Sequence, residues 1–249
     1  MEKGTWDFRE IRGSPIGLLD TFQPLSPYAH LCIPFSSAVV IGSTQDLATL
    51  DAESGYLKAF EVVRRHSGGG AVAVIPGELV WVNIGIPKGN ELWCEDVASS
   101  SLWLGRVWEN VLKEFGITQS QVVATGPSNP SMGRIACFGS TSPGEVHVGD
   151  KKIVGISQRR TREGSVFQSA MLLVWRPELL IDLLAPCLTS GADIRNELTS
   201  HAIGLSELIG NDSGIVPLPQ AGVVDERIGH LGLTNLVWES LKGALIALS

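Results

Sequence analysis

The chain has 249 residues, of which 44% are hydrophobic and 18% charged, and a mean hydropathy of +0.18. This composition predicts one globular domain over residues 1–249, and the net charge of −7 argues against nucleic-acid or membrane-surface partners. No secretory signal or membrane-length apolar stretch is recognisable, so we expect a cytoplasmic protein. The four cysteines form no CxxC pair and the five histidines are dispersed, which predicts reduced thiols and no metal site.

Hydrophobic patterning predicts strands and helices that do not alternate strictly. The expected elements are a buried strand at 38–41, two strands within 71–86 joined at Pro76–Gly77, a helix at 96–115 closed by Gly116, an irregular connection at 125–145, a hairpin at 145–160, a strand at 164–175, a helix at 177–188 and a last helix at 235–249. This order is typical of an α+β fold, with mixed or antiparallel sheets and flanking helices. Neither a P-loop nor a GxGxxG motif is present.

The stretch RRHSGGGAV, which begins at Arg64, places two arginines and a histidine against three successive glycines. Successive glycine N–H groups can form a nest that accepts an anion, and the missing Cβ atoms let a ligand lie against the backbone. Arg64 and Arg65 could add bidentate donors to a phosphate or carboxylate. The spacing alone leaves open a flexible hairpin loop with solvated charges.

The hairpin sequence GDKKIVGISQRR carries two adjacent lysines. Because side chains alternate along a strand, one of Lys151 and Lys152 must point inward, where it could clamp an oxyanion. A polar hairpin tip with two solvated lysines is the alternative. Arg159, Arg160 and Arg162 add to the basic cluster.

Cys137 lies in the irregular connection, outside any apolar periodic segment. A nearby lysine or arginine would favour its thiolate form and make it a competent nucleophile. A buried structural thiol is the alternative, and is the commonest fate of a free cysteine.

The two long motifs occur together in one known family. RRHSGGGAV and the later DKKIVGISQRR resemble the RRxSGGGxV loop and the (G/D)xKKxxG(x)(S/A)QxR hairpin of the lipoate–protein ligase and octanoyltransferase family. VVIGSTQ, which ends at Gln45, resembles that family's short G-x-x-Q strand end. The resemblance covers residues 39–173 and implies the α+β catalytic domain shared with biotin protein ligases.

The resemblance implies an octanoyl or lipoyl substrate destined for a lysine on a lipoyl domain. Lys152 matches the family's invariant lysine, which grips the carbonyl or phosphate oxygen during transfer. Lys152 and Cys137 are therefore the implied catalytic residues. The glycine loop would line the acyl tunnel. The implied substrate-binding residues are Gln45, Arg64, Arg65, Ser67, Gly68, Gly69, Gly70, Gly155 and Gln158.

Two activation chemistries exist within the family. Ligases activate lipoate with ATP as an acyl-adenylate, whereas transferases carry the acyl group on a cysteine. In the transferase branch a CF pair precedes the invariant lysine at the spacing that separates Cys137–Phe138 from Lys152, and Glu145 falls where that branch has an acidic residue. We therefore predict a transferase without a tightly bound cofactor; ATP and Mg are required only by the ligase alternative. A non-catalytic binder of lipoate or lipoyl domains is the third hypothesis.

The implied partners are lipoyl domains of 2-oxoacid dehydrogenases or the glycine-cleavage H protein, with acyl carrier protein as the donor and a monomeric enzyme. The chain departs from the family pattern at three positions. Ser169 replaces the histidine of QHGTLL, Met171 stands at its threonine or serine, and Gly144 replaces a tyrosine or asparagine.

Overall fold

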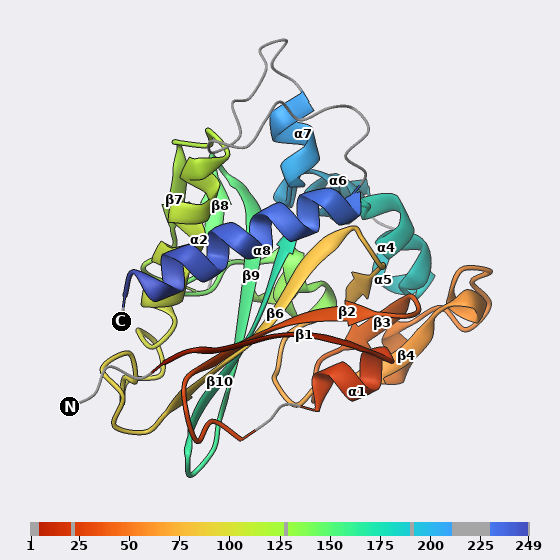
Figure 1. Ribbon diagram of the computed structural model, residues 1–249. Helices are drawn as coiled ribbons and strands as arrows, with labels where there is room; N and C mark the ends of the chain where they lie inside the picture. The colour runs from red at the N-terminus through yellow and green to blue at the C-terminus, as the bar shows by residue number, and fades with distance from the viewer. Residues whose placement is uncertain (1–4, 21–22, 127–128, 190–191, 211–229, 249) are drawn as a thin grey trace.

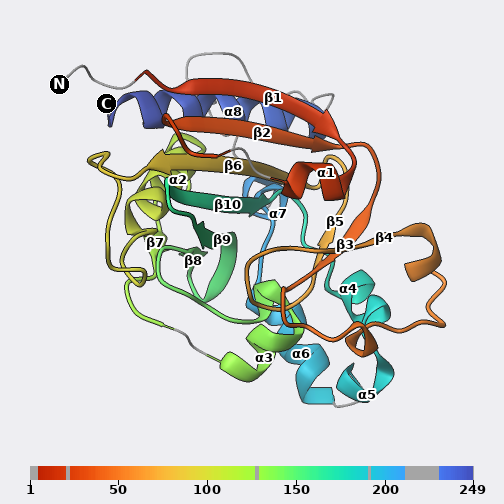
Figure 2. The ribbon, with the colours of Figure 1, turned by 90° about the horizontal axis from the view of Figure 1, so that it is seen from below.

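The structure, a computed structural model, describes residues 5–20, 23–126, 129–189, 192–210 and 230–248. Its frame is a seven-stranded sheet with the spatial order β1-β2-β6-β10-β9-β8-β7 (Figure 2). Its strands are β1 (Asp7–Gly13), β2 (Tyr28–Pro34), β6 (Leu79–Pro87), β7 (Ser120–Val122), β8 (Val146–Val148), β9 (Lys151–Arg160) and β10 (Gly164–Leu172). The β1–β2 pair is parallel and the other neighbouring pairs are antiparallel, so the sheet is mixed.

A smaller sheet of three strands lies against one face of the large sheet. It has the order β4-β3-β5 and consists of β3 (Ala38–Ile41), β4 (Glu61–Arg64) and β5 (Val72–Val74). Both β4 and β5 pair with β3 and not with each other. The opposite face of the large sheet is covered by two helices that pack together, α2 (Leu102–Glu114) and α8 (His230–Ile246) (Figure 1).

Short helices complete the fold, most of them on the side of the molecule that carries the small sheet (Figure 2), whereas Leu205, Leu208 and Ile209 pack into the cluster formed with α2 and α8. The short helices are α1 (Pro15–Leu19), α3 (Pro130–Ile135), α4 (Pro177–Leu183), α5 (Pro186–Thr189), α6 (Ala192–His201) and α7 (Leu205–Gly210), with 3₁₀ turns η1 (Leu47–Thr49), η2 (Leu57–Ala59) and η3 (Cys137–Gly139). Among the described helices, none has the length and apolar character needed to cross a bilayer.

The central strand β6 shows why the sequence of this region is almost continuously apolar. Val80, Val82 and Ile84 pack into the cluster formed with α2 and α8, whereas Leu79 and Trp81 pack into the cluster formed with the small sheet. A strand covered on both faces has no solvated side, so the alternation of apolar and polar residues disappears.

The predicted α+β class with mixed sheets and flanking helices is confirmed. The buried strand at 38–41 has the predicted bounds, and the hairpin within 145–160 forms as β8 and β9. Helix α2 ends as predicted, because Gly116 adopts a positive φ of 80° just after it.

Two predictions about connections are wrong. The helix expected at 96–115 begins only at Leu102, because the Asp96 carboxylate accepts hydrogen bonds from the N–H groups of Ala98 and Ser99 and forms a turn instead. The two strands joined at Pro76–Gly77 are expected to pair with each other as a hairpin, but β5 belongs to the small sheet and β6 to the large one.

The predicted bounds of three helical segments also differ from the structure, in two cases because a proline begins a helix. The connection at 125–145 contains α3, because the Asn129 side chain accepts from the N–H of Met132 and Pro130 begins the helix. The helix expected at 177–188 ends at Leu183, and Pro186 begins a separate one. The last helix begins at His230, before the expected start, and Ser249 lies outside the described residues. Strands β1, β2, β4 and β7 and helices α1, α6 and α7 were not predicted.

Candidate active site

The end of the glycine loop is bonded to the turn that carries Cys137. Ala71 and Ala136 form a parallel bridge, in which the N–H of Ala71 donates to the Ile135 carbonyl at 2.9 Å. The N–H of Cys137 donates to the Ala71 carbonyl at 2.8 Å. These bonds bring together two motifs that are far apart in the sequence.

The close approach of two backbones explains why glycine is needed here. A Cβ atom on Gly70 would lie 2.3 Å from the backbone nitrogen of Ala136, and one on Gly42 would lie 1.9 Å from the Gly69 carbonyl oxygen. Gly69 also has a φ of +99°, which other residues rarely adopt. Because β4 and β5 do not pair, the loop is not the flexible hairpin that the spacing left open.

Both arginines of the loop motif donate to backbone carbonyls. Arg65 is buried and donates to the carbonyls of Gly68 and Gly70 at 2.8 and 3.0 Å from Nη2. Arg64 Nη1 donates to the carbonyls of Gly42 and Gln45 at 2.9 and 2.6 Å. The arginines therefore hold the shape of the loop, while their contact with an anionic ligand stays a prediction.

Gln45 and Ser67, the other polar residues predicted to bind substrate near the glycine loop, differ in their hydrogen bonding. The Gln45 side chain accepts from Gly42 N and donates to the Ile135 carbonyl, both at 3.2 Å, so it ties the end of β3 to α3. The hydroxyl of Ser67 is buried and has no hydrogen-bond partner, whereas Gly68 has open space where a side chain would lie. Ser67 Oγ is thus a buried side-chain atom of the loop without a hydrogen-bond partner.

A cavity lies between the two sheets, and we call it the inter-sheet cavity. Its volume, counted as the space open to the centres of water molecules, is ≈ 60 Å³, and all the space between its walls, with the open solvent at its mouth, amounts to ≈ 520 Å³. Its apolar lining consists of Leu19, Val40, Val72, Val74, Leu79, Trp81, Phe138, Ile156 and Ala170. Its other lining residues are Arg65, Cys137, Gly155, Ser157, Gln168 and Ser169. An apolar cavity with a few polar groups suits an acyl chain.

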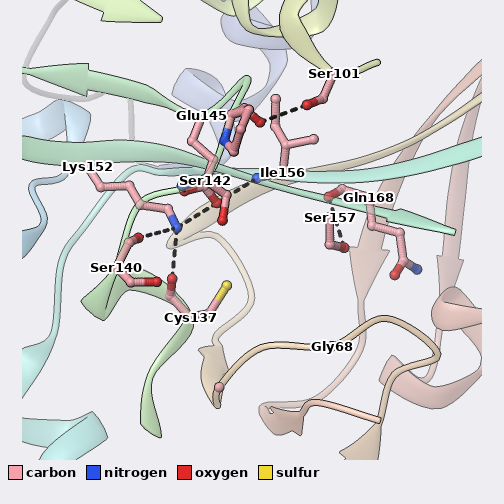
Figure 3. A network of polar contacts seen from close by, with 12 residues as sticks. Gly68, Ser101, Cys137, Ser140, Ser142, Glu145, Lys152, Ile156, Ser157 and Gln168 are labelled. Atoms are coloured by element: carbon pink, nitrogen blue, oxygen red, sulfur yellow. Dashed lines mark hydrogen bonds and ion pairs between the residues drawn. The ribbon is translucent and has the colours of Figure 1, made fainter. Parts of the chain in front are cut away.

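Lys152 is the inward-pointing lysine of the hairpin, and Lys151 is exposed. The Lys152 side chain is 1% exposed, and its Nζ lies 2.7 Å from Glu145 Oε1 (Figure 3). The same nitrogen donates to the carbonyls of Cys137 at 2.8 Å and Ser140 at 3.1 Å. An ammonium group has three N–H donors, so these acceptors satisfy all of them. The lysine thereby fixes both ends of the η3 turn.

A register shift in β9 directs Lys152 toward this turn. Val154 pairs with Val146, but the next residue of β8, His147, pairs with Lys152, which leaves Ile153 as an extra residue on β9. Such a bulge reverses the side-chain alternation. Without it, Lys152 would share the face of Val154, which packs into the core beneath α2 and α8.

Glu145 is the buried counter-ion of Lys152. Burial raises the pKa of the Glu145 carboxyl, and the ammonium of Lys152 together with hydrogen bonds from the N–H groups of Ser142 and Ile156 opposes that rise. Gly144, the departure from the family pattern just before it, has a φ of +88°, and a Cβ there would lie 2.3 Å from Ser101 Oγ at the start of α2. The packing of α2 therefore accounts for glycine at this position.

Cys137 presents its side chain to the inter-sheet cavity. Figure 3 shows its sulfur on the side of the turn where Ser157, Gln168 and Gly68 lie. Both backbone polar groups of Cys137 are hydrogen-bonded: its N–H donates to the Ala71 carbonyl, and its carbonyl accepts from Lys152 Nζ. A half-buried thiol on a fixed turn fits the predicted nucleophile better than the alternative of a fully buried structural thiol.

Two histidines lie near the Lys152 ammonium. Burial, followed by the positive charge of Lys152, lowers the pKa of His147 to about 4. Burial likewise lowers the pKa of His201, which precedes the bridge between Ala202 and Lys152. The Nε2 atoms of both rings are buried without a partner. Both imidazoles are therefore neutral at pH 7, and Lys152 is the cation of this region.

Two groups of predicted residues lie elsewhere. Gln158 bonds to the hydroxyls of Ser100 and Ser165, and it does not line the inter-sheet cavity. Arg160 donates to the carbonyls of Cys94 and Glu95. The cavity lining includes Arg65 but none of Arg159, Arg160 and Arg162. By contrast Gly155 lies in the site, where a Cβ would be 3.3 Å from the Phe138 ring.

Several cavity residues were not predicted. Trp81, Leu79, Gln168 and Ala170 lie on the cavity-facing side of β6 and β10. The residues of β6 alternate between two apolar environments, so only the pairing of strands distinguishes one face from the other. Within the described ranges, no group of three or more His, Cys, Asp or Glu side chains is placed to hold a metal ion.

The comparisons with known proteins identify the family. The family model for the lipoyl protein ligase A/B catalytic domain matches residues 18–216, which extends beyond the predicted 39–173 at both ends. The chain belongs to this family, and membership supports an enzyme of the ligase or transferase type in protein lipoylation. A search of curated proteins finds no match.

Solved structures of lipoate ligases share the fold. The chain is similar to a structure from the archaeal lipoylation system of Thermoplasma acidophilum, a bi-partite lipoate protein ligase and its E2 lipoyl domain (TM-score 0.67, 15% identity, 98% of this chain and 85% of that one). It is also similar to a lipoate-protein ligase A bound with ATP (TM-score 0.66, 17% identity, 98% and 86%). A third is P. falciparum LipL1 in complex with lipoate (TM-score 0.61, 14% identity, 98% and 64%). At these identities the likeness concerns the fold.

The contact between the glycine loop and Ala136 predicts a difference between two glycines. Gly70→Ala should destabilise the protein by about 1–3 kcal/mol, because its Cβ overlaps a backbone that cannot easily move. Gly68→Ala is the matched control, with open space at its Cβ, and should leave the free energy of unfolding nearly unchanged. Urea denaturation of both variants checks this. Equal midpoints would contradict the close approach.

The buried ion pair predicts a strong coupling between its members. Lys152→Met and Glu145→Gln should each destabilise by about 3–5 kcal/mol, because each leaves one buried charge without its partner. The double variant should be less destabilised than the sum, by about 0.5–3 kcal/mol. Urea denaturation measures the cycle, and Lys151→Met is the exposed control. Additive effects would show that the two charges do not interact.

The low pKa of His147 predicts a loss of stability in acid. The unfolded ring binds a proton near pH 6.5 and the folded ring near pH 4, so the unfolded state gains protons first as the pH falls. His147→Gln should therefore lose about 2–3 kcal/mol less than the wild type between pH 7 and 4.5. His201 and Glu145 remain in both proteins, and exposed His66→Gln is the control. Denaturation at both pH values tests this.

Proposed function

We propose that this protein transfers an octanoyl or lipoyl group to lipoyl domains through a thioester on Cys137. The observation that carries the proposal is the position of the Cys137 thiol, at the wall of an apolar cavity on a turn fixed by Lys152 and by the glycine loop. Each CH₂ of an acyl chain buried there contributes about 0.8 kcal/mol, so the cavity supplies most of the recognition.

The first step forms the acyl-enzyme. The Cys137 thiolate attacks the carbonyl carbon of a thioester on an acyl carrier protein, forming one C–S bond and breaking the other. The carrier leaves as a thiolate and takes up a proton. To reach the oxyanion of this step, Lys152 exchanges one of its carbonyl partners, Cys137 or Ser140, for the acyl oxygen.

The second step delivers the acyl group. The neutral amine of the target lysine attacks the Cys137 thioester, the C–N bond forms as the C–S bond breaks, and the amine loses its proton to solvent. The thiolate of Cys137 is regenerated. This sequence requires no tightly bound cofactor, and consumes neither ATP nor Mg.

The partners follow from the same chemistry. The acceptor is a lipoyl domain of a 2-oxoacid dehydrogenase or the glycine-cleavage H protein; a T. acidophilum lipoyl domain appears with one structural neighbour, which supports this choice. The donor is acyl carrier protein, and the enzyme acts as a monomer in the cytoplasm, where its four cysteines stay reduced.

A ligase that activates lipoate with ATP is the second candidate. It is favoured by the neighbour bound with ATP, and by Arg65, the guanidinium in the cavity lining. In that reaction Cys137 would form no bond to the acyl group. A binder without turnover is the third candidate, suggested by Ser169 and Met171; both are fully buried, and the Ser169 hydroxyl donates to the Val82 carbonyl.

Intact-mass spectrometry of the protein mixed with octanoyl carrier protein should show an octanoyl adduct, followed by its transfer to a lipoyl domain. Cys137→Ser should form neither product, since a hydroxyl is a much weaker nucleophile, and Cys94→Ser is the control with a free thiol outside the cavity lining. Normal turnover by Cys137→Ser would overturn the proposal. Lipoate-dependent exchange of pyrophosphate with ATP would identify the ligase instead.

A further inference from the structure

We propose that Trp81 closes the inter-sheet cavity at the end opposite Cys137 and limits the acyl chain to about eight carbons. This inference rests on the proposed function, because it assumes an acyl group whose carbonyl end lies at Cys137. The length of the acyl chain would then be selected by the Trp81 side chain, which is held by the Asn83 side chain and, through it, by the Leu18 carbonyl.

Three residues that pair in one row across the large sheet set the direction of the acyl chain. Ala170 of β10 pairs with Gly155 of β9 on one side and with Trp81 of β6 on the other. All three residues line the inter-sheet cavity. Phe138, the neighbour of Cys137, lies over Gly155, so the reactive end is at β9 and the far end is at β6.

The length of this row matches the proposed substrate. Neighbouring strands are about 4.8 Å apart, so the backbone of Trp81 lies about 10 Å from that of Gly155. A carbon–carbon bond is about 1.5 Å long and advances an extended chain by about 1.3 Å, so the seven bonds of an octanoyl chain span about 9 Å. An octanoyl chain whose carbonyl lies over Gly155 therefore ends at Trp81.

The indole is held in place and does not act as a movable flap. Its Nε1 donates to Asn83 Oδ1 at 2.9 Å, and Asn83 Nδ2 donates to the Leu18 carbonyl of α1 at 2.8 Å. Trp81 and Asn83 are each 5% exposed. Displacing the ring would leave buried polar atoms of Trp81 and Asn83 without partners, which is unfavourable. Leu19 of α1 also lines the cavity and packs in the same cluster as Trp81.

The space behind the indole belongs to β2. Cys32 pairs with Trp81, is 4% exposed, and burial raises the pKa of its thiol to about 12, so it behaves as a small apolar side chain. A smaller side chain at position 81 would extend the cavity toward Cys32 in the direction of the acyl chain. The added space is apolar and suits further CH₂ groups.

The test measures binding of free hexanoate, octanoate, decanoate and dodecanoate by calorimetry. For the wild type, each added CH₂ should raise affinity by about fourfold up to octanoate, and decanoate should bind more weakly than octanoate. For Trp81→Leu the rise should continue to decanoate. Trp81→Phe, a milder change that keeps a buried ring, should give an intermediate profile if Trp81→Leu fails to fold. Trp108→Leu is the control, since it removes a buried indole of α2 on the other face of the large sheet.

The outcomes separate the two proposals. Binding does not require a thioester, so a chain-length shift without an octanoyl adduct on Cys137 would support the role of Trp81 and overturn the transfer mechanism. An adduct with the same octanoate preference in the wild type and in both Trp81 variants would overturn the role of Trp81. A shift of equal size in Trp108→Leu would overturn it as well, and so would failure of the wild type to bind octanoate, whereas the transfer mechanism is tested by the adduct on Cys137 alone.

Discussion

The buried contact between Lys152 and Glu145 is the interaction on which the site depends. It joins β9 to the turn that follows Ser142, and through the carbonyls of Cys137 and Ser140 it joins both to η3. Removing two charges from water is unfavourable, and the pair is tolerated because backbone groups complete the hydrogen bonds of both members. The ammonium is consequently held at the backbone of the turn that carries the thiol.

The glycine loop holds the other side of the same turn. Its glycines allow two backbones to approach more closely than any side chain would permit, and Arg65 satisfies the carbonyls that this approach leaves unpaired. The turn of Cys137 is thus fixed by a cation on one side and by a parallel bridge on the other. Rigidity of this kind favours catalysis, since small displacements of a nucleophile reduce the rate strongly.

Motifs that carry charge or backbone freedom were readable from the sequence, whereas the shape of the cavity was not. Lys152, Cys137 and the glycines were identified from local patterns and a family resemblance, and the structure brings them together. Gln158 was placed in the same motif but faces Ser100, because adjacent residues of a strand point to opposite sides. Trp81 was missed because both faces of β6 are apolar, so only the register with Ala170 shows which residues face the ligand.

The short connection through Pro76–Gly77, between β5 and β6, affects the order in which the parts of the site can assemble during folding. Val74 and Leu79 lie on opposite walls of the inter-sheet cavity, yet only a few residues separate them along the chain. Closing so short a loop loses little entropy, so the apolar walls can meet early. Cys137 and Lys152 arrive from much later segments, whose contacts with the walls require longer loops to close. During synthesis the part of the apolar lining up to Trp81 therefore emerges and can pack before Cys137 and Lys152 exist, and Phe138, Ile156 and Ala170 complete that lining later.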